Sequence, residues 1–274
     1  MRIADKEKPD FKTWLKHENL APATIENYVW TVNFFSTHYP ELNKENLLEY
    51  KDWLIQRFGP NTVNTRILAM NKYCQYIGRD DLKLRCVKQQ TKNFLENVIS
   101  NADYNYFKKQ LHEQLDNQMW YFAVWFMVAT GARISELLKF KVEHVMDGYI
   151  DLYTKCGKVR RIYIPIKLKT EAMKWLNETG KVSGFIFTNK WGEPISARGI
   201  SIQLKRYAIQ FGVDPEVVYP HSFRHRFAKN FLDRYNDLSL LADLMGHEDI
   251  ETTRIYLRKT STEQREIVDR VVNW

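Results

Sequence analysis

Four short segments of the sequence carry side chains that can bind or transfer a phosphoryl group. Arginine offers paired donors to phosphate oxygens and stays charged at any working pH. A tyrosine hydroxyl attacks only where positive charge favours its phenolate, and a lysine ammonium can protonate a departing alkoxide. Together the set suits phosphoryl transfer, in which a protein contributes mainly positioning and electrostatics. Its members are Arg133, Lys155, His221, Arg224, His247 and Tyr256.

Each segment also has a plainer structural explanation when it is taken alone. Glu136 follows Arg133 by one helical turn, so the pair could either hold the guanidinium for an anion or merely cap a helix junction. Lys155 lies in a turn, where solvated lysines are common, and Lys158 replaces it if the turn has a different register. A tyrosine near a helix end, as at Tyr256, is normally a core residue. Only the combination is specific.

Two histidines four residues apart, His221 and His225, raise the alternative of a zinc site. The H-E-x-x-H arrangement needs glutamate where Ser222 stands, and Arg224 between the histidines would repel a cation. The sequence therefore favours a phosphate site here and predicts no metal ligand.

Composition supports a globular protein with a polyanionic partner. The chain has 274 residues, 44% of them hydrophobic and 14% aromatic, which allows one large domain or two modest ones and excludes disordered, collagen-like and low-complexity classes. Its net charge is +8. Residues 151–210 alone carry 12 Lys and Arg against 4 Asp and Glu, a surplus as large as that of the whole chain. A localised basic region of this kind makes nucleic acid a plausible partner.

Compartment signals favour the cytoplasm. The N-terminus has no apolar segment typical of a secretory signal, and the most apolar run, Met119–Thr130, is shorter than the ~20 residues that span a bilayer. Three widely spaced cysteines fit a reducing environment and argue against a disulfide framework or a cysteine–zinc site. We expect no membrane association.

The elements that must position the reactive residues divide into two parts. Residues 1–85 read as several amphipathic helices, including one capped by Thr24, and form a small helical domain. Residues 86–97 are polar and predict a linker. Residues 98–274 form a larger helical domain with a central apolar helix at 120–129 and a short amphipathic helix at 266–274. Between them the sequence predicts helices at about 196–211, 220–232, 238–245, with Gly246 as its C-cap, and from 249.

The β signal is confined to one region. Residues 149–153 and 160–164 predict a hairpin with Gly157 in its turn, and residues 185–187 could add a third strand. The predicted fold class is therefore mainly α with a small antiparallel β-sheet.

The four segments together resemble the tyrosine recombinase, or phage integrase, family. The matching features are Thr-Gly-x-Arg-Ile-Ser-Glu-Leu, a basic hairpin lysine, His-x-x-Arg-His, Gly-His, and a tyrosine nine residues beyond that histidine. Their order and spacing agree over about residues 100–258. The helical N-terminal region resembles the family's core-binding domain, and the chain length is similar to that of short Xer-type members, which lack an arm-binding domain.

The resemblance implies a role for each residue. Arg133 and Arg224 would clamp the scissile phosphate with help from His221 and His247, and Lys155 would protonate the leaving 5′ oxygen. Tyr256 would be the nucleophile and form a 3′-phosphotyrosyl link, without metal, ATP or other cofactor. Glu136 and His225 match supporting positions.

The resemblance also implies partners. Double-stranded recombination sites would be gripped by a clamp of the two domains, and four copies would assemble on DNA by exchanging C-terminal segments, with accessory DNA-bending proteins as an option and the nucleoid as the location. Alternatives are a type IB topoisomerase-like relaxing enzyme and a non-catalytic DNA-binding protein. The reaction itself could be integration, excision or resolution. Candidate DNA contacts are Lys12, Lys16, Asn64, Arg66, Lys72, Lys158, Arg160, Arg161, Arg198, Lys205 and Arg206.

Overall fold

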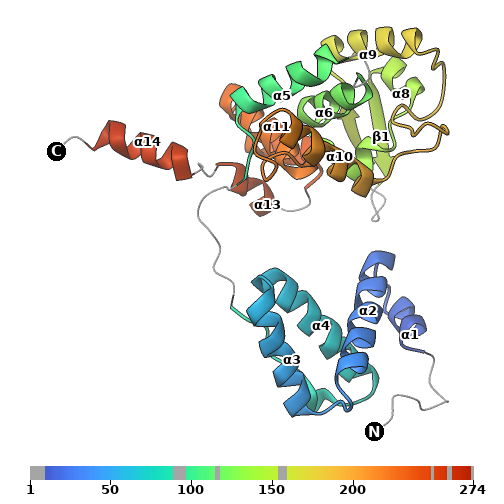
Figure 1. Cartoon of the computed structure of the whole chain (residues 1–274), viewed down its shortest axis with the longest axis vertical. Coiled ribbons are helices and arrows are strands. Elements are labelled where there is room, and N and C mark those ends of the chain that lie inside the picture. The colour runs from blue at the N-terminus through green and yellow to red at the C-terminus, as the bar shows by residue number, and fades with distance from the viewer. Residues whose placement is uncertain are drawn as a thin grey trace. The chain divides into compact units, whose positions relative to one another are not determined.

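Two compact units make up the chain, residues 1–91 and 92–274, and their boundary lies within the segment 86–97 (Figure 1). The structure, a computed structural model, describes residues 10–88, 97–114, 118–153, 159–247, 250–257 and 261–272. Within these ranges the fold is mainly α with one two-stranded antiparallel sheet, which confirms the predicted fold class. No helix in these ranges is long and apolar enough to cross a membrane.

Over residues 10–88, the N-terminal unit has four α-helices followed by a 3₁₀ turn at Asp80–Leu82. The helices are α1 (Phe11–His17), α2 (Pro22–His38), α3 (Lys44–Arg57) and α4 (Pro60–Tyr76). Their apolar faces enclose a core that includes Phe35, Tyr50 and Met70. The prediction that Thr24 caps the second helix is wrong. That helix begins at Pro22, because proline in the first turn has a suitable φ and lacks the N–H that would be left unpaired there.

The N-terminal unit extends further than the predicted linker boundary. The side-chain amide of Asn64 donates to the carbonyl of Val87 (3.1 Å) and accepts from its N–H (2.8 Å). Asn71 makes the same pair of bonds with Leu84, both at 2.8 Å. Two asparagines of α4 thus each pair with both the N–H and the carbonyl of one residue in the segment after the 3₁₀ turn, as in strand pairing. Val87, which was assigned to the linker, packs on the N-terminal core.

The C-terminal unit is built around α6 (Gln118–Thr130), whose residues are buried on nearly every side, as expected for the central helix. α5 (Asn101–Glu113) and α11 (Pro220–Arg234) pack on it. Ile99 fastens the start of the unit to α11, because its N–H donates to Ser222 Oγ and its carbonyl accepts from the Arg226 guanidinium. The remaining helices of this part are α7 (Ile134–Leu137), α8 (Val142–Asp147), α9 (Ile166–Glu178) and α10 (Ala197–Gln210).

The predicted hairpin is present as β1 (Tyr149–Tyr153) paired with β2 (Val159–Tyr163). The register places Tyr149 opposite Tyr163 and Tyr153 opposite Val159. The third strand is not formed. Phe185 makes an isolated bridge to Lys141, so the described part of that segment adds a single pairing instead of a strand.

The C-terminal region continues through α12 (Leu238–Met245), α13 (Glu251–Arg254), a 3₁₀ turn η3 (Ile255–Leu257) and α14 (Ser261–Val271). α12 ends at Gly246 with φ +61°, the left-handed conformation predicted for that glycine. The terminal helix begins five residues earlier than the predicted start at 266, and residues 273–274 lie outside the described ranges.

Candidate active site

The junction between α6 and α7 places Arg133 beside Glu136. The Arg133 N–H donates to Glu136 Oε2 (2.7 Å), and its Nη1 donates to Oε1 (3.0 Å). The predicted pairing of these two residues is therefore confirmed. Gly131 makes the turn possible, because its φ is +63° and a Cβ there would lie 2.4 Å from the Phe227 ring. Arg133 keeps 37% of its side chain exposed, so it remains accessible to an anion.

Arg224 reaches the same junction from α11. Its side chain is 3% exposed, and it donates to the carbonyls of Gly131 (2.6 Å) and Met245 (2.7 Å). Burial lowers the pKa of Arg224 to about 10, and the nearby positive charges of Arg133 and Arg160 act in the same direction. The two guanidiniums therefore lie close together, and their positive charges are not fully neutralised by neighbouring carboxylates. Such an arrangement is suited to binding an anion.

His247 follows Gly246 and is oriented from both sides. Its Nε2 lies 3.0 Å from Arg224 Nη2, and its Nδ1 lies 2.7 Å from Thr253 Oγ1. Because a guanidinium can only donate, Nε2 must accept, which assigns the proton to Nδ1. Burial, together with the charges of Arg224 and Arg133, lowers the pKa of His247 to about 4. His247 is therefore a neutral imidazole in the absence of DNA.

Tyr256 lies in η3, and only 6% of it is exposed. Its ring faces those of His225 (centroids 5.2 Å apart) and His247 (6.1 Å) and packs in a small cluster with Leu232, Leu241 and Met245. Burial raises the pKa of the Tyr256 hydroxyl, whereas Arg224, through its charge and a hydrogen bond, lowers it. The nucleophile predicted from sequence thus lies next to one arginine and one histidine of the predicted set.

The two histidines of α11 differ in their surroundings. His221 is exposed, and partial burial followed by the charges of Arg224 and Arg133 lowers its pKa. His225 has its Nδ1 buried without a hydrogen-bond partner among the described residues, and burial lowers its pKa to about 4. Across the described residues, no group of three or more His, Cys, Asp and Glu is arranged to hold a metal ion.

Two predicted residues cannot be placed. Lys155 and Lys158 lie in 154–158, outside the described residues, so their assigned roles stay predictions.

The prediction that Arg160 contacts DNA is wrong. Its side chain is 6% exposed and points inward. It donates to Glu136 Oε1 (2.5 Å) and, through Nε and Nη2, to the carbonyl of Leu244 (3.0 and 2.7 Å). The cause is strand alternation, because Arg160 shares the buried face of β2 with Ile162. The same alternation, read from the sequence, could have assigned it inward.

Sequence reasoning also missed Thr253. It is fully buried and provides the hydroxyl that orients His247. Its position six residues after a candidate histidine carries no sequence signal, because the contact depends on the turn between α12 and α13.

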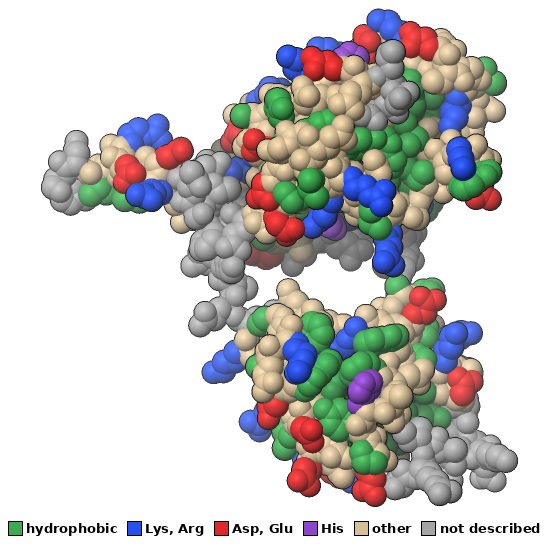
Figure 2. Space-filling view, in the orientation of Figure 1, with side chains coloured by type: hydrophobic (Ala, Val, Ile, Leu, Met, Phe, Trp, Pro, Cys, Tyr) green, Lys and Arg blue, Asp and Glu red, His purple; other side chains and the backbone are tan. Residues whose placement is uncertain are grey.

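Some of the predicted DNA contacts of the N-terminal unit are bound to other protein groups, and others are exposed. The prediction that Asn64 contacts DNA is wrong, because its side-chain amide is hydrogen-bonded to the backbone of Val87. Arg66 donates to Asn27 and Thr31 and lies over the Trp30 ring, and Lys72 pairs with Glu18. Figure 2 shows hydrophobic side chains interspersed with Lys and Arg on the viewed face of this unit.

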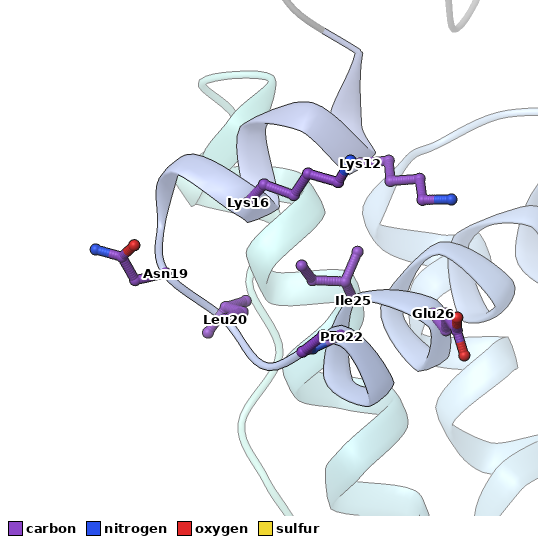
Figure 3. A pocket seen from close by; sticks show the side chains of 7 residues that line it. All are labelled: Lys12, Lys16, Asn19, Leu20, Pro22, Ile25 and Glu26. Atoms are coloured by element: carbon purple, nitrogen blue, oxygen red, sulfur yellow. The ribbon is translucent and has the colours of Figure 1, made fainter. Parts of the chain in front are cut away.

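Lys12 and Lys16 are exposed and border a pocket of about 450 Å³ at the start of α2. Figure 3 shows the two lysines on one side of it, with Leu20 and Pro22 on the other. The remaining lining residues are Asn19, Ile25 and Glu26.

In the C-terminal unit, Arg161 forms a two-point pair with Asp151 (2.8 and 2.7 Å), and Lys205 pairs with Glu216 (2.9 Å). Arg198 and Arg206 are exposed on α10. Exposed ion pairs exchange readily for phosphate contacts, so these four residues stay candidates.

Comparison with known proteins agrees with this geometry. The chain is 27% identical over 273 residues to tyrosine recombinase XerA of Pyrococcus furiosus, covering 95% of this chain and 92% of that protein. It is 34% identical over 151 residues to tyrosine recombinase XerD of Halalkalibacterium halodurans, covering 52% and 50%.

Solved structures share the fold. One is the Tn1549 transposon integrase in complex with transposon right end DNA (TM-score 0.72, 16% identity, 95% of this chain and 98% of that chain). Another is a lambda integrase dimer bound to a COC′ core site (TM-score 0.73, 16% identity, 96% and 77%). Residues 91–263 match the phage integrase family. On this match and these relatives, the chain belongs to the phage integrase family and is an Xer-like tyrosine recombinase.

Proposed function

We propose that this protein cleaves and rejoins DNA strands at specific recombination sites through a covalent bond between Tyr256 and a 3′ phosphate. The observation that carries the proposal is the convergence of Arg133, Arg224, His247 and Tyr256, from four separate elements, around one junction. Relatives named tyrosine recombinases and DNA-bound integrases of the same fold support the same reaction class.

In the proposed reaction, Arg133 and Arg224 neutralise the nonbridging oxygens of the scissile phosphate. The Tyr256 oxygen forms a bond to phosphorus while the bond from phosphorus to the 5′ oxygen breaks. The phenol proton passes to a neutral imidazole of the site, and Lys155 gives a proton to the departing 5′ oxygen. Reversal, with the 5′ hydroxyl of another strand as the attacking group, restores the phosphodiester and releases the tyrosine. The phosphotyrosine conserves the bond energy, so rejoining requires no ATP, and the cationic side chains neutralise the phosphate charge, a role that a metal ion has in other phosphoryl transfers.

Because Tyr256 is buried in the free protein, the bound DNA phosphate has a role in forming the reactive arrangement. In the free protein Arg224 directs a donor at His247, and Tyr256 is enclosed in its apolar cluster. A phosphate bound between Arg133 and Arg224 would accept hydrogen bonds from both guanidiniums and would lie close to the Tyr256 hydroxyl. Phosphate binding would therefore bring the reacting phosphorus to the enclosed tyrosine.

The direct test is trapping of the adduct. A nicked suicide substrate, in which the released 5′ fragment diffuses away, should accumulate a covalent complex with the wild-type protein and none with Tyr256→Phe. Tyr235→Phe, which removes a solvent-exposed hydroxyl of the same unit, is the matched control and should react normally. An adduct formed by Tyr256→Phe would disprove the assignment. Sequencing the trapped nucleotide would identify the site.

A topoisomerase-like activity is the second candidate, although the recombinase relatives favour the first. A supercoiled plasmid that carries two copies of the mapped site distinguishes the two. Recombinant circles support strand exchange, whereas relaxation alone would support a relaxing enzyme.

We also propose that the N-terminal unit contributes to binding of the duplex and that four copies assemble on two sites. Of the DNA contacts predicted in this unit, Lys12 and Lys16 are exposed. The exposed Val268 and Val271 of α14 would dock on a neighbouring copy. The protein would then act at the nucleoid, with accessory DNA-bending proteins where the sites require them. Val268→Ser with Val271→Ser should leave binding of one copy to a half-site unchanged and weaken cooperative binding to a full site.

A further inference from the structure

Arg160 is a third arginine of the site, and protein acceptors hold its guanidinium. Each of its three guanidinium nitrogens donates to a protein acceptor, either the carbonyl of Leu244 or Glu136 Oε1. With 6% of its side chain exposed, it is not placed to bind DNA from solvent. It lies on β2, whereas the residues it touches belong to α7 and α12. Arg160 therefore joins β2 to both α7 and the end of α12.

The end of α12 receives one arginine on each of three consecutive carbonyls. Leu244 O accepts from Arg160, Met245 O from Arg224 (2.7 Å) and Gly246 O from Arg133 (3.1 Å). The last carbonyls of a helix have no partners within the helix and carry partial negative charge, so they are good acceptors for cations. The helix end thereby fixes the spacing of the three guanidiniums.

Among the described residues, one carboxylate, that of Glu136, lies within 4 Å of all three arginines. Its oxygens lie 3.0 Å from Arg133, 2.5 Å from Arg160 and 3.8 Å from Arg224. Arg133 and Arg160 both donate to Oε1, and the Arg133 backbone N–H donates to Oε2, so Arg224 lies at the longest distance. If Arg160 were absent, Arg224 would be the nearest cation able to take its place, and movement toward Glu136 would carry it away from His247.

We propose that Arg160 is a positioning residue of the strand-cleavage reaction, which occupies Glu136 so that Arg224 stays directed at His247 and the phosphate. The inference rests on the proposed function for its consequence in catalysis. Its structural part, the placement of Arg224 against His247, can be measured without DNA.

The first experiment measures that placement. In full-length protein labelled with ¹⁵N-histidine, the wild type should show His247 with Nδ1 protonated and Nε2 as a hydrogen-bonded acceptor. In Arg160→Met the Nε2 resonance should shift, because Arg224 has moved toward Glu136. In Arg160→Met combined with Glu136→Gln the shift should be smaller, because the uncompensated charge that attracts Arg224 is gone. A His247 resonance that is the same in wild type and Arg160→Met would overturn the proposal.

The second experiment measures adduct formation in a single turnover on the nicked substrate. We expect Arg160→Met to react about 10- to 100-fold more slowly, the loss that is typical when a residue that orients a metal ligand is removed. Arg160→Lys should not restore the rate, because one ammonium cannot span Leu244 O and Glu136 as the planar guanidinium does. Arg79→Met, which removes an exposed two-point pair with Asp81, is the control and should react at the wild-type rate.

A neutral substrate separates positioning from general damage to the fold. A methylphosphonate at the scissile position lacks the charge that the arginines neutralise, so the loss caused by Arg160→Met should be smaller on it than on the natural phosphate. An equal loss on both substrates, with a lowered melting temperature, would overturn the proposal. A wild-type protein that forms no adduct while Arg160→Met still shifts His247 would instead contradict the proposed function and leave the positioning role supported.

Discussion

The α-carbon of Gly246 lies against the side chain of Arg160. A Cβ on residue 246 would stand 2.3 Å from Arg160 Cδ and 2.8 Å from Nε. Two features therefore require glycine at position 246. One is the left-handed φ of +61° that ends α12, and the other is the close contact with the Arg160 side chain of β2. The C-cap that the sequence predicted is also a packing surface for the active site.

Gly246→Ala should destabilise the protein by more than the left-handed backbone alone explains. Gly212 is the matched control, because its φ is +70° and nothing lies within 4 Å of the position of its Cβ. We expect Gly212→Ala to cost about 1–2 kcal/mol, the penalty of the left-handed conformation. Gly246→Ala should cost clearly more by urea unfolding and should also slow adduct formation. Equal costs would mean that Arg160 moves aside without effect.

Thr253→Val should impair the reaction through His247. The substitution keeps the shape of a fully buried side chain but removes the oxygen 2.7 Å from His247 Nδ1. The imidazole then loses its orientation, and an unpaired buried donor costs about 1–3 kcal/mol. We expect a slower adduct rate with DNA affinity unchanged in a gel-shift titration. Thr31→Val, at a buried threonine of the N-terminal unit, controls for the loss of a hydroxyl and should keep the adduct rate.

Stability should fall as the pH is lowered from about 6.5 toward 4. The pKa values of His225 and His247 are both lowered to about 4 by burial, so the unfolded chain binds more protons than the folded one between these pH values. The stabilisation is complete above the unfolded pKa and is lost as the pH falls through this window. Urea unfolding at pH 7 and pH 5 measures it. His225→Phe should reduce the difference, and an unchanged pH dependence would show that His225 titrates normally.

Asn64 and the Lys12–Lys16 pair should respond oppositely in DNA-binding experiments. Asn64→Ala leaves the Val87 N–H and carbonyl without their partners, so it should lower the melting temperature and leave the salt dependence of DNA affinity unchanged. Lys12→Ala and Lys16→Ala should keep the melting temperature and each reduce the slope of log affinity against log salt by about 1. A reduced slope for Asn64→Ala would restore it as a DNA contact.

Much of the fold was predictable from the sequence because its signals are local. The helices follow from apolar periodicity, the end of α12 from Gly246, and the hairpin from two short β-rich runs. The pairing of Arg133 with Glu136 needed only the helical spacing of three residues. The errors arose where a distant partner decided the outcome. Phe185 forms an isolated bridge to Lys141 and does not pair with a strand. Val87 binds an asparagine that lies 23 residues earlier in the chain.

The sequence by itself determined the chemistry that is available: two arginines, two histidines, a lysine and a tyrosine in the order and spacing of the family. Only the tertiary structure decided what each cation faces. Arg160 and Arg161 are neighbours in sequence, yet one is buried against Glu136 and the other is paired with Asp151 at the surface. The physical reason is that charge can be counted along the chain, whereas burial and the choice of partner depend on which elements pack together.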